Sequence, residues 1–207
     1  EHGVGSIPKN YQNPHPPIAM SAMSPHSSSV KTAALRGWGP ISANFCPEYV
    51  VASHWGKYVE GCREAGREPT GQDWRVARNI LVAESDQQAL DWAMDPKGSN
   101  HYYFRYLWEV LKRANYTVVM KSDPAMPDEA VTVEGLIESM MIYGSSRTVT
   151  EKLLAFRERV GPFSTLLMAS MDGSGANRHR EWETMRRLAT EVLPRVREAT
   201  RRAPAMA

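Results

Sequence analysis

Several features that mark specialised classes of protein are scarce in this sequence of 207 residues. It has only two cysteines, Cys46 and Cys62, which form no disulfide framework and no metal-ligand spacing, so we expect reduced thiols. The six histidines form no HxH or HExxH pattern, which disfavours a metal site. No apolar run approaches the ~20 residues that span a bilayer. With 25 basic and 23 acidic side chains the net charge is +2, which argues against nucleic-acid binding.

These properties predict a globular cytoplasmic protein with no nucleic-acid and no membrane partner. The sequence shows no signal peptide, and it begins with EHGVGSIPKNYQ, without an initiator methionine. We therefore expect its start to be a cut end.

What the sequence does have is an alternation of strand and helix patterns. PPIAMSAM fits a short buried strand, VKTAALRG a short helix that ends at Gly37, and GPISANF a second strand. This order within about thirty residues is typical of a parallel βαβ unit.

The same alternation continues to the end of the chain. EYVVASHWGKYVEGCREAG predicts an amphipathic helix that ends at Gly66, and WRVARNILVAES a third strand. Helices are expected at 86–94, at 133–142 and from Ser146 to about Val160, where Thr148 and Glu151 have capping-box spacing. FSTLLMASM predicts a fourth strand covered on both faces. A last helix is expected over 180–197, with an apolar stripe of Trp182, Met185, Leu188, Ala189, Val192 and Leu193.

Three stretches depart from this alternation. Residues 1–16 read as an irregular lead-in, and 199–207 as a tail. Residues 95–132 form a long aromatic insertion, which leaves two interpretations. One is a helical insertion packed on the outside, and the other is a lid that supplies Tyr102, Tyr103, Phe104 and Trp108 to a pocket.

Four parallel strands cannot close a barrel, because closure needs about eight. An open doubly wound sheet, two half-barrels joined between chains, and the second half of a larger protein all accommodate the pattern. The missing initiator methionine favours the last.

Two runs of sequence resemble a known family. NPHPPIAMSAMSPHSSSVKTAALRGWGPISANF is similar to the fifth strand, fifth helix and sixth strand of the bacterial luciferase-like flavin monooxygenases. IYGSSRTVTEKLLAFRERVGPFSTLLM is similar to the family's last helix and strand. The resemblance is greatest to limonene-monooxygenase-like members and covers about residues 10–198. It implies an α/β fold in which this chain supplies the C-terminal four βα units of a (βα)8 TIM-like barrel, residues 17–198.

The resemblance also implies flavin chemistry. Members of this family bind reduced FMN at the carboxyl end of the barrel and use O2 to oxygenate a small organic substrate, often with a separate flavin reductase. FAD or a deazaflavin serves some relatives. The family places the catalytic groups on early strands, so we expect them in an absent N-terminal half and assign none here. Pairing with that half, or a dimer, is expected.

The hydroxyl-rich stretch SPHSSS, residues 24–29, has two interpretations. Serines at a helix start commonly cap it. They also suit phosphate binding, because the first turn of a helix offers unpaired N–H groups and the positive end of the helix dipole. The resemblance maps the flavin-phosphate positions onto Met23, Ser24 and Ser27, with Ser28 as a neighbour. Met23 departs from the family, since the luciferases have a carboxylate there.

Other candidates are weaker. Gly144, Ser145 and Ser146 begin a helix and are expected to be structural. Asn44 and Phe45 end a strand on the side where barrel sites lie, but a packed strand end is the more common role. His101 is expected in a surface aromatic cluster, His26 is either near the phosphate or simply exposed, and Met20, Met23, Met168 and Met171 are expected as core filler.

Three alternatives to a monooxygenase remain at this point. The first is a non-catalytic flavin-binding half-barrel, and the second is a deazaflavin-dependent hydride-transfer enzyme on the same scaffold. The third is a structural subunit whose sheet edges pair with a partner chain.

Overall fold

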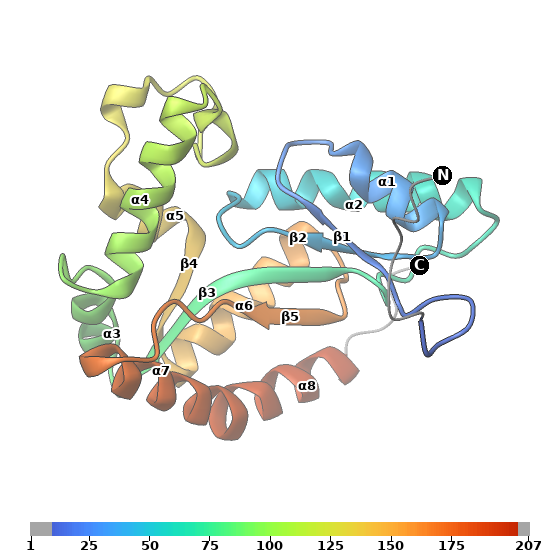
Figure 1. Cartoon of the computed structure of the whole chain (residues 1–207). Coiled ribbons are helices and arrows are strands. Elements are labelled where there is room, and N and C mark those ends of the chain that lie inside the picture. The colour runs from blue at the N-terminus through green and yellow to red at the C-terminus, as the bar shows by residue number, and fades with distance from the viewer. Residues whose placement is uncertain (1–9, 203–207) are drawn as a thin grey trace.

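The long strand β3 (Arg75–Ala83) organises the sheet in the computed structural model, which describes residues 10–202. The strand order is β1 (Ala19–Ala22), β2 (Gly39–Ser42), β3 and β4 (Met141–Ser145), with β5 (Thr165–Met168) also paired to β3, and every pairing is parallel. β5 lies along the first half of β3 and β4 along the second half. Figure 1 shows β3 bending strongly between these two partners.

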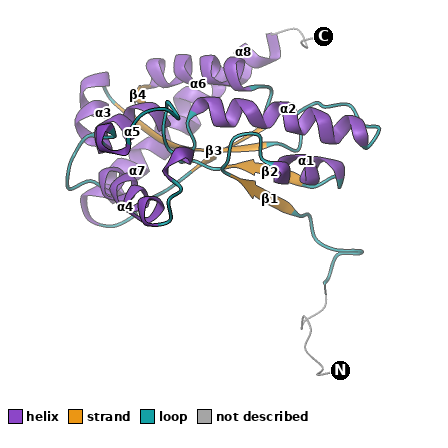
Figure 2. Ribbon diagram, turned by 90° about the horizontal axis from the view of Figure 1, so that it is seen from above, coloured by secondary structure: helices purple, strands orange, loops and turns teal. Residues whose placement is uncertain are grey.

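Helices cover the sheet and its carboxyl end, as Figures 1 and 2 show. Their bounds are α1 Ser28–Leu35, α2 Glu48–Glu64, α3 Asp86–Ala93, α4 Ser99–Arg113, α5 Val133–Met140, α6 Ser146–Val160, α7 Gly175–Arg187 and α8 Leu193–Arg202. Short 3-10 turns occupy Thr117–Val119 and Asp128–Ala130, and a π-helical turn at Leu188–Val192 joins α7 to α8.

Two apolar clusters hold these elements together. The larger one joins α1, α2 and α6 to the sheet around the fully buried Trp74, Tyr58 and Val76. The smaller one joins α3, α4 and α5 to the far ends of β3 and β4, around Phe104 and Ile137. The second cluster fixes the insertion to the carboxyl end of the sheet.

The predicted α/β fold with a parallel sheet is confirmed, and the four predicted strands correspond to β1, β2, β3 and β5. β4 was not predicted. The helix expected over 133–142 ends at Met140, and a strand follows at once because its residues pair with Asn79–Ala83 of β3.

Three expectations about burial are wrong. β5 is half-buried along its length, because it pairs on one side only and lies at an edge of the sheet. Trp182 and Met185 are exposed, at 59% and 49%, because α7 turns its Thr184 face to β3 while the π-helical turn brings Leu188 and Val192 into the core. Of the four methionines expected as core filler, none is fully buried and Met168 alone packs against a core cluster. Met23 is exposed, and Met20, Met168 and Met171 are half-buried.

The insertion, residues 95–132, is largely helical. α4 buries His101, Phe104 and Trp108 against the smaller cluster and exposes Tyr102 and Tyr106. The expected surface cluster at His101 is therefore wrong, since this side chain is only 8% exposed and its Nε2 lies 3.4 Å from Glu134 Oε1.

The two ends of the chain follow the expected outline only in part. Residues 10–16 of the lead-in form neither helix nor strand, while residues 1–9 lie outside the described part. α8 extends through residue 202, so the described portion of the predicted tail is helical. Within residues 10–202, β1 has β2 as its sole strand partner, and no helix is both long and apolar enough to cross a membrane.

Candidate functional site

A hollow of about 290 Å³ opens where β1 and β2 end. It is lined by Ser21, Ala22, Met23, Ser24, Ser27, Ser29, Ala43, Phe45 and Tyr116. Residues 23–29, here named the serine turn, comprise the connection from β1 to α1 and the first two residues of α1, and they form one wall. In parallel α/β folds, ligands bind outside the carboxyl ends of the strands, which is where this hollow lies.

Of the four predicted flavin-binding residues, the structure brings Met23, Ser24 and Ser27 to this hollow. Ser28 is exposed and does not line it, although it is the first residue of α1. Ser27 holds the N-cap position, yet no side chain in the described part of the chain caps α1. The expected cap is therefore not formed, and no described side chain accepts a hydrogen bond from the first-turn N–H groups of α1, beside which Ser27 and Ser29 line the hollow.

The serine turn is held from behind by α2 and the segment before it. The Cys46 thiol donates to the Met23 carbonyl at 3.2 Å, and His54 Nε2 lies 3.0 Å from the Ser24 carbonyl. The His26 backbone N–H donates to Ser53 Oγ at 2.8 Å. Burial raises the pKa of the Cys46 thiol to about 12 and lowers that of His54, so both groups are neutral donors near pH 7.

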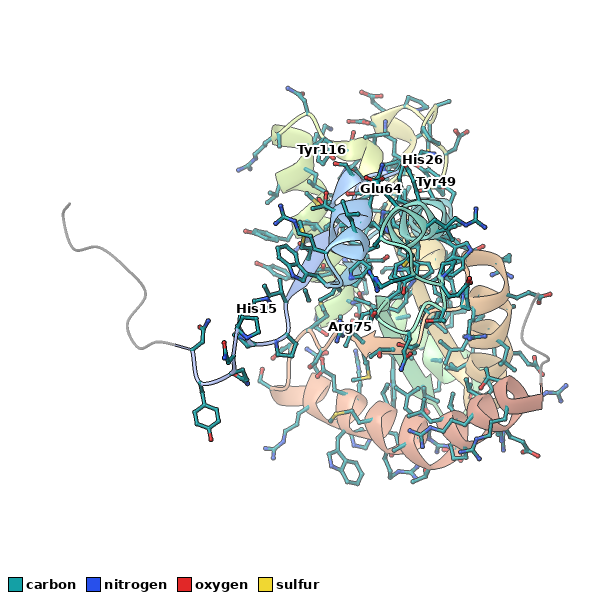
Figure 3. All side chains as sticks on the ribbon, turned by 90° about the vertical axis from the view of Figure 1, so that its right-hand side faces the viewer. His15, His26, Tyr49, Glu64, Arg75 and Tyr116 are labelled. Atoms are coloured by element: carbon teal, nitrogen blue, oxygen red, sulfur yellow. The ribbon has the colours of Figure 1, made fainter. Side chains whose placement is uncertain are left out.

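Tyr116 reaches the hollow from the insertion, and no sequence pattern predicts this. It follows α4 in an irregular turn, and Figure 3 shows it at the same upper end of the molecule as His26 and Tyr49. The Tyr49 hydroxyl of α2 lies 3.5 Å from the Val118 carbonyl beside it. No periodicity marks such a residue, because its position depends on how the insertion folds back.

A second polar group lies beside the hollow, where β2, β3 and α4 meet. The Asn44 amide donates to Asn79 Oδ1 at 2.6 Å and to the Tyr103 hydroxyl at 3.0 Å, and the Asn79 amide donates to Asn100 Oδ1 at 3.3 Å. Asn79 is fully buried, and burial raises the pKa of Tyr103. The packed strand end predicted for Asn44 is thus a hydrogen-bonded amide network that ties α4 to the sheet.

An open pocket of about 400 Å³ lies between α4 and the segment after β5. Its lining combines Tyr102, Tyr103 and Tyr106 with Lys97, Gly98, Ser99, Met171, Asp172 and Asn177. Of the insertion's predicted pocket residues, Tyr102 and Tyr103 lie here, while Phe104 and Trp108 are core residues.

The helix start at Gly144, Ser145 and Ser146 is a second candidate for phosphate binding, but the protein's own side chains bind its N–H groups. Ser145 Oγ accepts from the Thr148 N–H, and the Ser145 N–H donates to Asp86 Oδ1 at 2.6 Å. The Thr148 hydroxyl donates to Asp86 Oδ2 at 2.9 Å. These hydrogen bonds, the one from the Ser145 N–H above all, hold the pKa of Asp86 below its usual value. The predicted structural role is supported, with the cap at Ser145.

The histidines are dispersed. His26 is exposed at the serine turn, His54 is buried behind it, and His15 lies on the extended lead-in away from the body of the molecule (Figure 3). Across residues 10–202, no three His, Cys, Asp or Glu side chains come together in a way that would hold a metal ion.

Parallel strands joined by helices, with a hollow lined by several serines at their carboxyl ends, define an α/β protein with its binding face at the strand ends. The family model for luciferase-like monooxygenases matches residues 1–162, and the chain belongs to this family.

Relatives of known activity agree with this assignment. The chain is 30% identical over 182 residues to 2,5-diketocamphane 1,2-monooxygenase 1 of Pseudomonas putida, with 87% of this chain and 49% of the relative covered. It is 30% identical over 158 residues to 3,6-diketocamphane 1,6-monooxygenase of the same organism, with 76% and 41% covered.

A solved structure is similar over the same extent. The oxygenating constituent of the Pseudomonas putida 3,6-diketocamphane monooxygenase, a type II Baeyer–Villiger enzyme in complex with FMN, superposes with a TM-score of 0.75 at 26% identity. The match covers 88% of this chain and 49% of that one. The chain therefore spans about half the length of the relatives that it matches.

Proposed function

We propose that this chain forms the flavin-phosphate-binding part of a flavin-dependent monooxygenase that oxygenates a small organic substrate with O2. The similar Pseudomonas putida structure contains FMN, and the curated relatives are monooxygenases. The observation that carries the proposal is the serine turn. Three of its predicted residues line a hollow at the strand ends, and no described side chain caps the helix that starts there.

The hollow fits a phosphate group in its chemistry. Ser24, Ser27 and Ser29 supply hydroxyl donors, and the positive end of the α1 dipole points at the same place. No carboxylate lines the hollow among the described residues, so nothing there repels a dianion. Met23 stands where luciferases have a carboxylate, and it offers the ligand backbone and apolar contact only.

The residues beyond the serine turn suit the rest of a flavin and a substrate. Phe45 and Tyr116 form the less polar part of the hollow, and the Asn44–Tyr103 network lies next to it. Bound flavin supplies the oxygen-activating redox chemistry, while this chain's residues bind it and limit water. We propose that the insertion 95–132 forms a fixed wall of the flavin site through Tyr116 and Tyr103. We also propose that residues 17–198 form the C-terminal half of a barrel.

Flavin titration tests the phosphate assignment. In the S24A/S27A double variant we expect FMN affinity to fall by about a hundredfold or more, because two hydrogen bonds to a charged group are lost and each is worth ~1.5–3 kcal/mol. Riboflavin, which lacks the phosphate, should bind as it does to the wild-type chain. Quenching of flavin fluorescence measures both affinities.

Ser28 provides the matched control. Its side chain is exposed and points away from the lining, so S28A should change FMN affinity less than threefold while S27A changes it strongly. Equal loss of FMN and riboflavin in S24A/S27A, or an S28A effect as large as that of S27A, would contradict the assignment. Formation of an oxygenated product from a cyclic ketone, measured with reduced FMN and O2 against a control without protein, then separates oxygenation from hydride transfer.

A further inference from the structure

Behind the serine turn lies a chain of buried hydrogen bonds that ends at the turn. Trp74 Nε1 lies 3.0 Å from Ser42 Oγ, Ser42 Oγ lies 2.8 Å from His54 Nδ1, and His54 Nε2 lies 3.0 Å from the Ser24 carbonyl oxygen. Trp74, Ser42 and His54 are all fully buried. Ser42 of β2, His54 of α2 and Trp74, the residue before β3, thus form a chain that ends at a single carbonyl group of the turn.

The chemistry of the groups fixes where each proton lies. The Ser24 carbonyl only accepts, so His54 Nε2 carries the proton. Burial lowers the pKa of His54 and outweighs the opposite effect of its hydrogen bond to the Ser24 carbonyl, and the nearby Arg78 guanidinium acts with burial, so the ring is neutral and Nδ1 is bare. Ser42 therefore donates its O–H to Nδ1 and accepts from the Trp74 N–H. Every proton points toward the turn.

We propose that His54 is a positioning residue for the flavin phosphate, a role that rests on the proposed function. Its Nε2–H holds the Ser24 carbonyl toward α2, so the negative end of this peptide dipole is turned away from an anion in the hollow. Cys46 holds the Met23 carbonyl in the same way. Because C=O and N–H point in opposite directions in a trans peptide, the Ser24 N–H is directed away from Cys46 and is available to the phosphate.

A pair of nearly isosteric variants tests this role. H54Q keeps an amide N–H near the position of Nε2, and H54N ends near Nδ1 and cannot reach Ser24. We expect H54N to lose about tenfold in FMN affinity, the equivalent of one well-placed hydrogen bond, with riboflavin affinity unchanged. H54Q should stay within threefold of the wild-type chain for both flavins. Fluorescence titration gives the affinities, and the ³¹P resonance of bound FMN reports directly on the phosphate.

The outcomes separate the possible roles. If H54N and H54Q weaken both flavins equally, His54 only stabilises the fold, and the proposal is wrong. If the wild-type chain prefers FMN but H54N binds it unchanged, the role of His54 alone is wrong. If the wild-type chain shows no preference for FMN over riboflavin, the phosphate site itself is absent. The titration of the wild-type chain alone gives this result, so it is distinguished from a failure of the His54 role.

A measurement on the wild-type chain covers the case in which H54N does not fold. In ¹⁵N-labelled protein at pH 7 we expect the neutral Nε2–H tautomer of His54, with Nδ1 as an acceptor. An Nδ1–H tautomer or an imidazolium would overturn the proposal, because neither leaves the directed hydrogen-bond chain intact.

Discussion

Two helices of this chain begin with serines at the carboxyl end of a strand, and they differ in what faces them. α6 begins after β4 with Ser145 as its cap and the Asp86 carboxylate bound to its first turn. α1 begins after β1 with Ser27 at the cap position, no side-chain cap from the described residues, and a hollow in front of it. Similar sequence chemistry therefore gives a capped helix start in one place and, in the other, a start that no described side chain caps.

The difference comes from the neighbouring elements. α3 packs beside β4 and brings Asp86, an internal anion, to the α6 start. At the α1 start the residues that contact the turn are Cys46, His54 and Ser53. None of these three side chains is an anion near pH 7. The Asp86 carboxylate thus completes the start of α6, whereas no side chain among residues 10–202 does the same for α1.

The largest expected effect comes from placing the same charge at both starts. S27D supplies a carboxylate cap to α1, and we expect it to raise Tm by about 1–3 °C through the helix dipole. It should also reduce FMN affinity by on the order of a hundredfold, because two like charges about 4 Å apart repel by ~1–4 kcal/mol. Thermal unfolding and flavin titration measure the two effects.

S145D should act in the opposite sense. Its carboxylate would face Asp86, and we expect the free energy of unfolding to fall by about 1–2 kcal/mol with FMN affinity unchanged. If S27D destabilises the chain or leaves FMN binding intact, the α1 start is not the open site described.

Removing the internal anion has the next largest effect. D86A deletes two hydrogen bonds at the α6 start, and we expect a loss of about 2 kcal/mol and a fall in Tm of about 4–8 °C. D91A, on the exposed face of the same helix α3, is the matched control and should stay within about 0.5 kcal/mol. Equal effects of D86A and D91A would show that Asp86 does not complete α6.

The stabilising effect of Asp86 should depend on pH. Its folded-state pKa is lowered, so its contribution is fully present above the ordinary value of 3.8 and is lost as pH falls through the lowered folded-state pKa. D86N removes the titration. The stability difference between wild type and D86N, measured by denaturant unfolding, should be constant above about pH 5 and shrink below pH 3.8. A difference that grows on acidification would contradict this sign.

The smallest effect is expected at Glu151. The sequence pattern pairs Thr148 with Glu151 as a capping box, but Glu151 instead binds the exposed Arg147 on the helix surface. E151A should therefore change stability by no more than about 0.5 kcal/mol, while S145A costs about 1 kcal/mol as a lost cap. Chemical denaturation of both variants measures the contrast. A larger loss of stability in E151A would contradict this and support the predicted capping box.

Much of the fold was predictable, because strand and helix periodicities are local properties. The elements at α1, α2 and α3 follow the predicted ranges closely. β4 was not predicted, because its sequence MIYGS is short and continues a helical pattern. This segment is a strand only because it pairs with β3. The exposure of Trp182 escaped prediction for a similar reason, since an apolar stripe does not reveal a π-helical turn that shifts the buried face.

The candidate site was predictable in its residues and not in its surroundings. Ser24 and Ser27 stood out through the resemblance and through the chemistry of serines at a helix start. No sequence pattern predicted a site role for Tyr116 or His54. Tyr116 belongs to a long insertion, and His54 occupies an ordinary position in a predicted helix.

Local sequence patterns establish an alternating α/β chain with a cluster of hydroxyls before a short helix, because such features depend on neighbouring residues and on helical or strand periodicity. Which serine-rich helix start lacks a side-chain cap follows instead from the fold. That outcome depends on side chains 30 to 60 positions away: Asp86 at one start and His54 at the other. Contacts of that range form when the sheet brings strand ends together, and no local pattern encodes them.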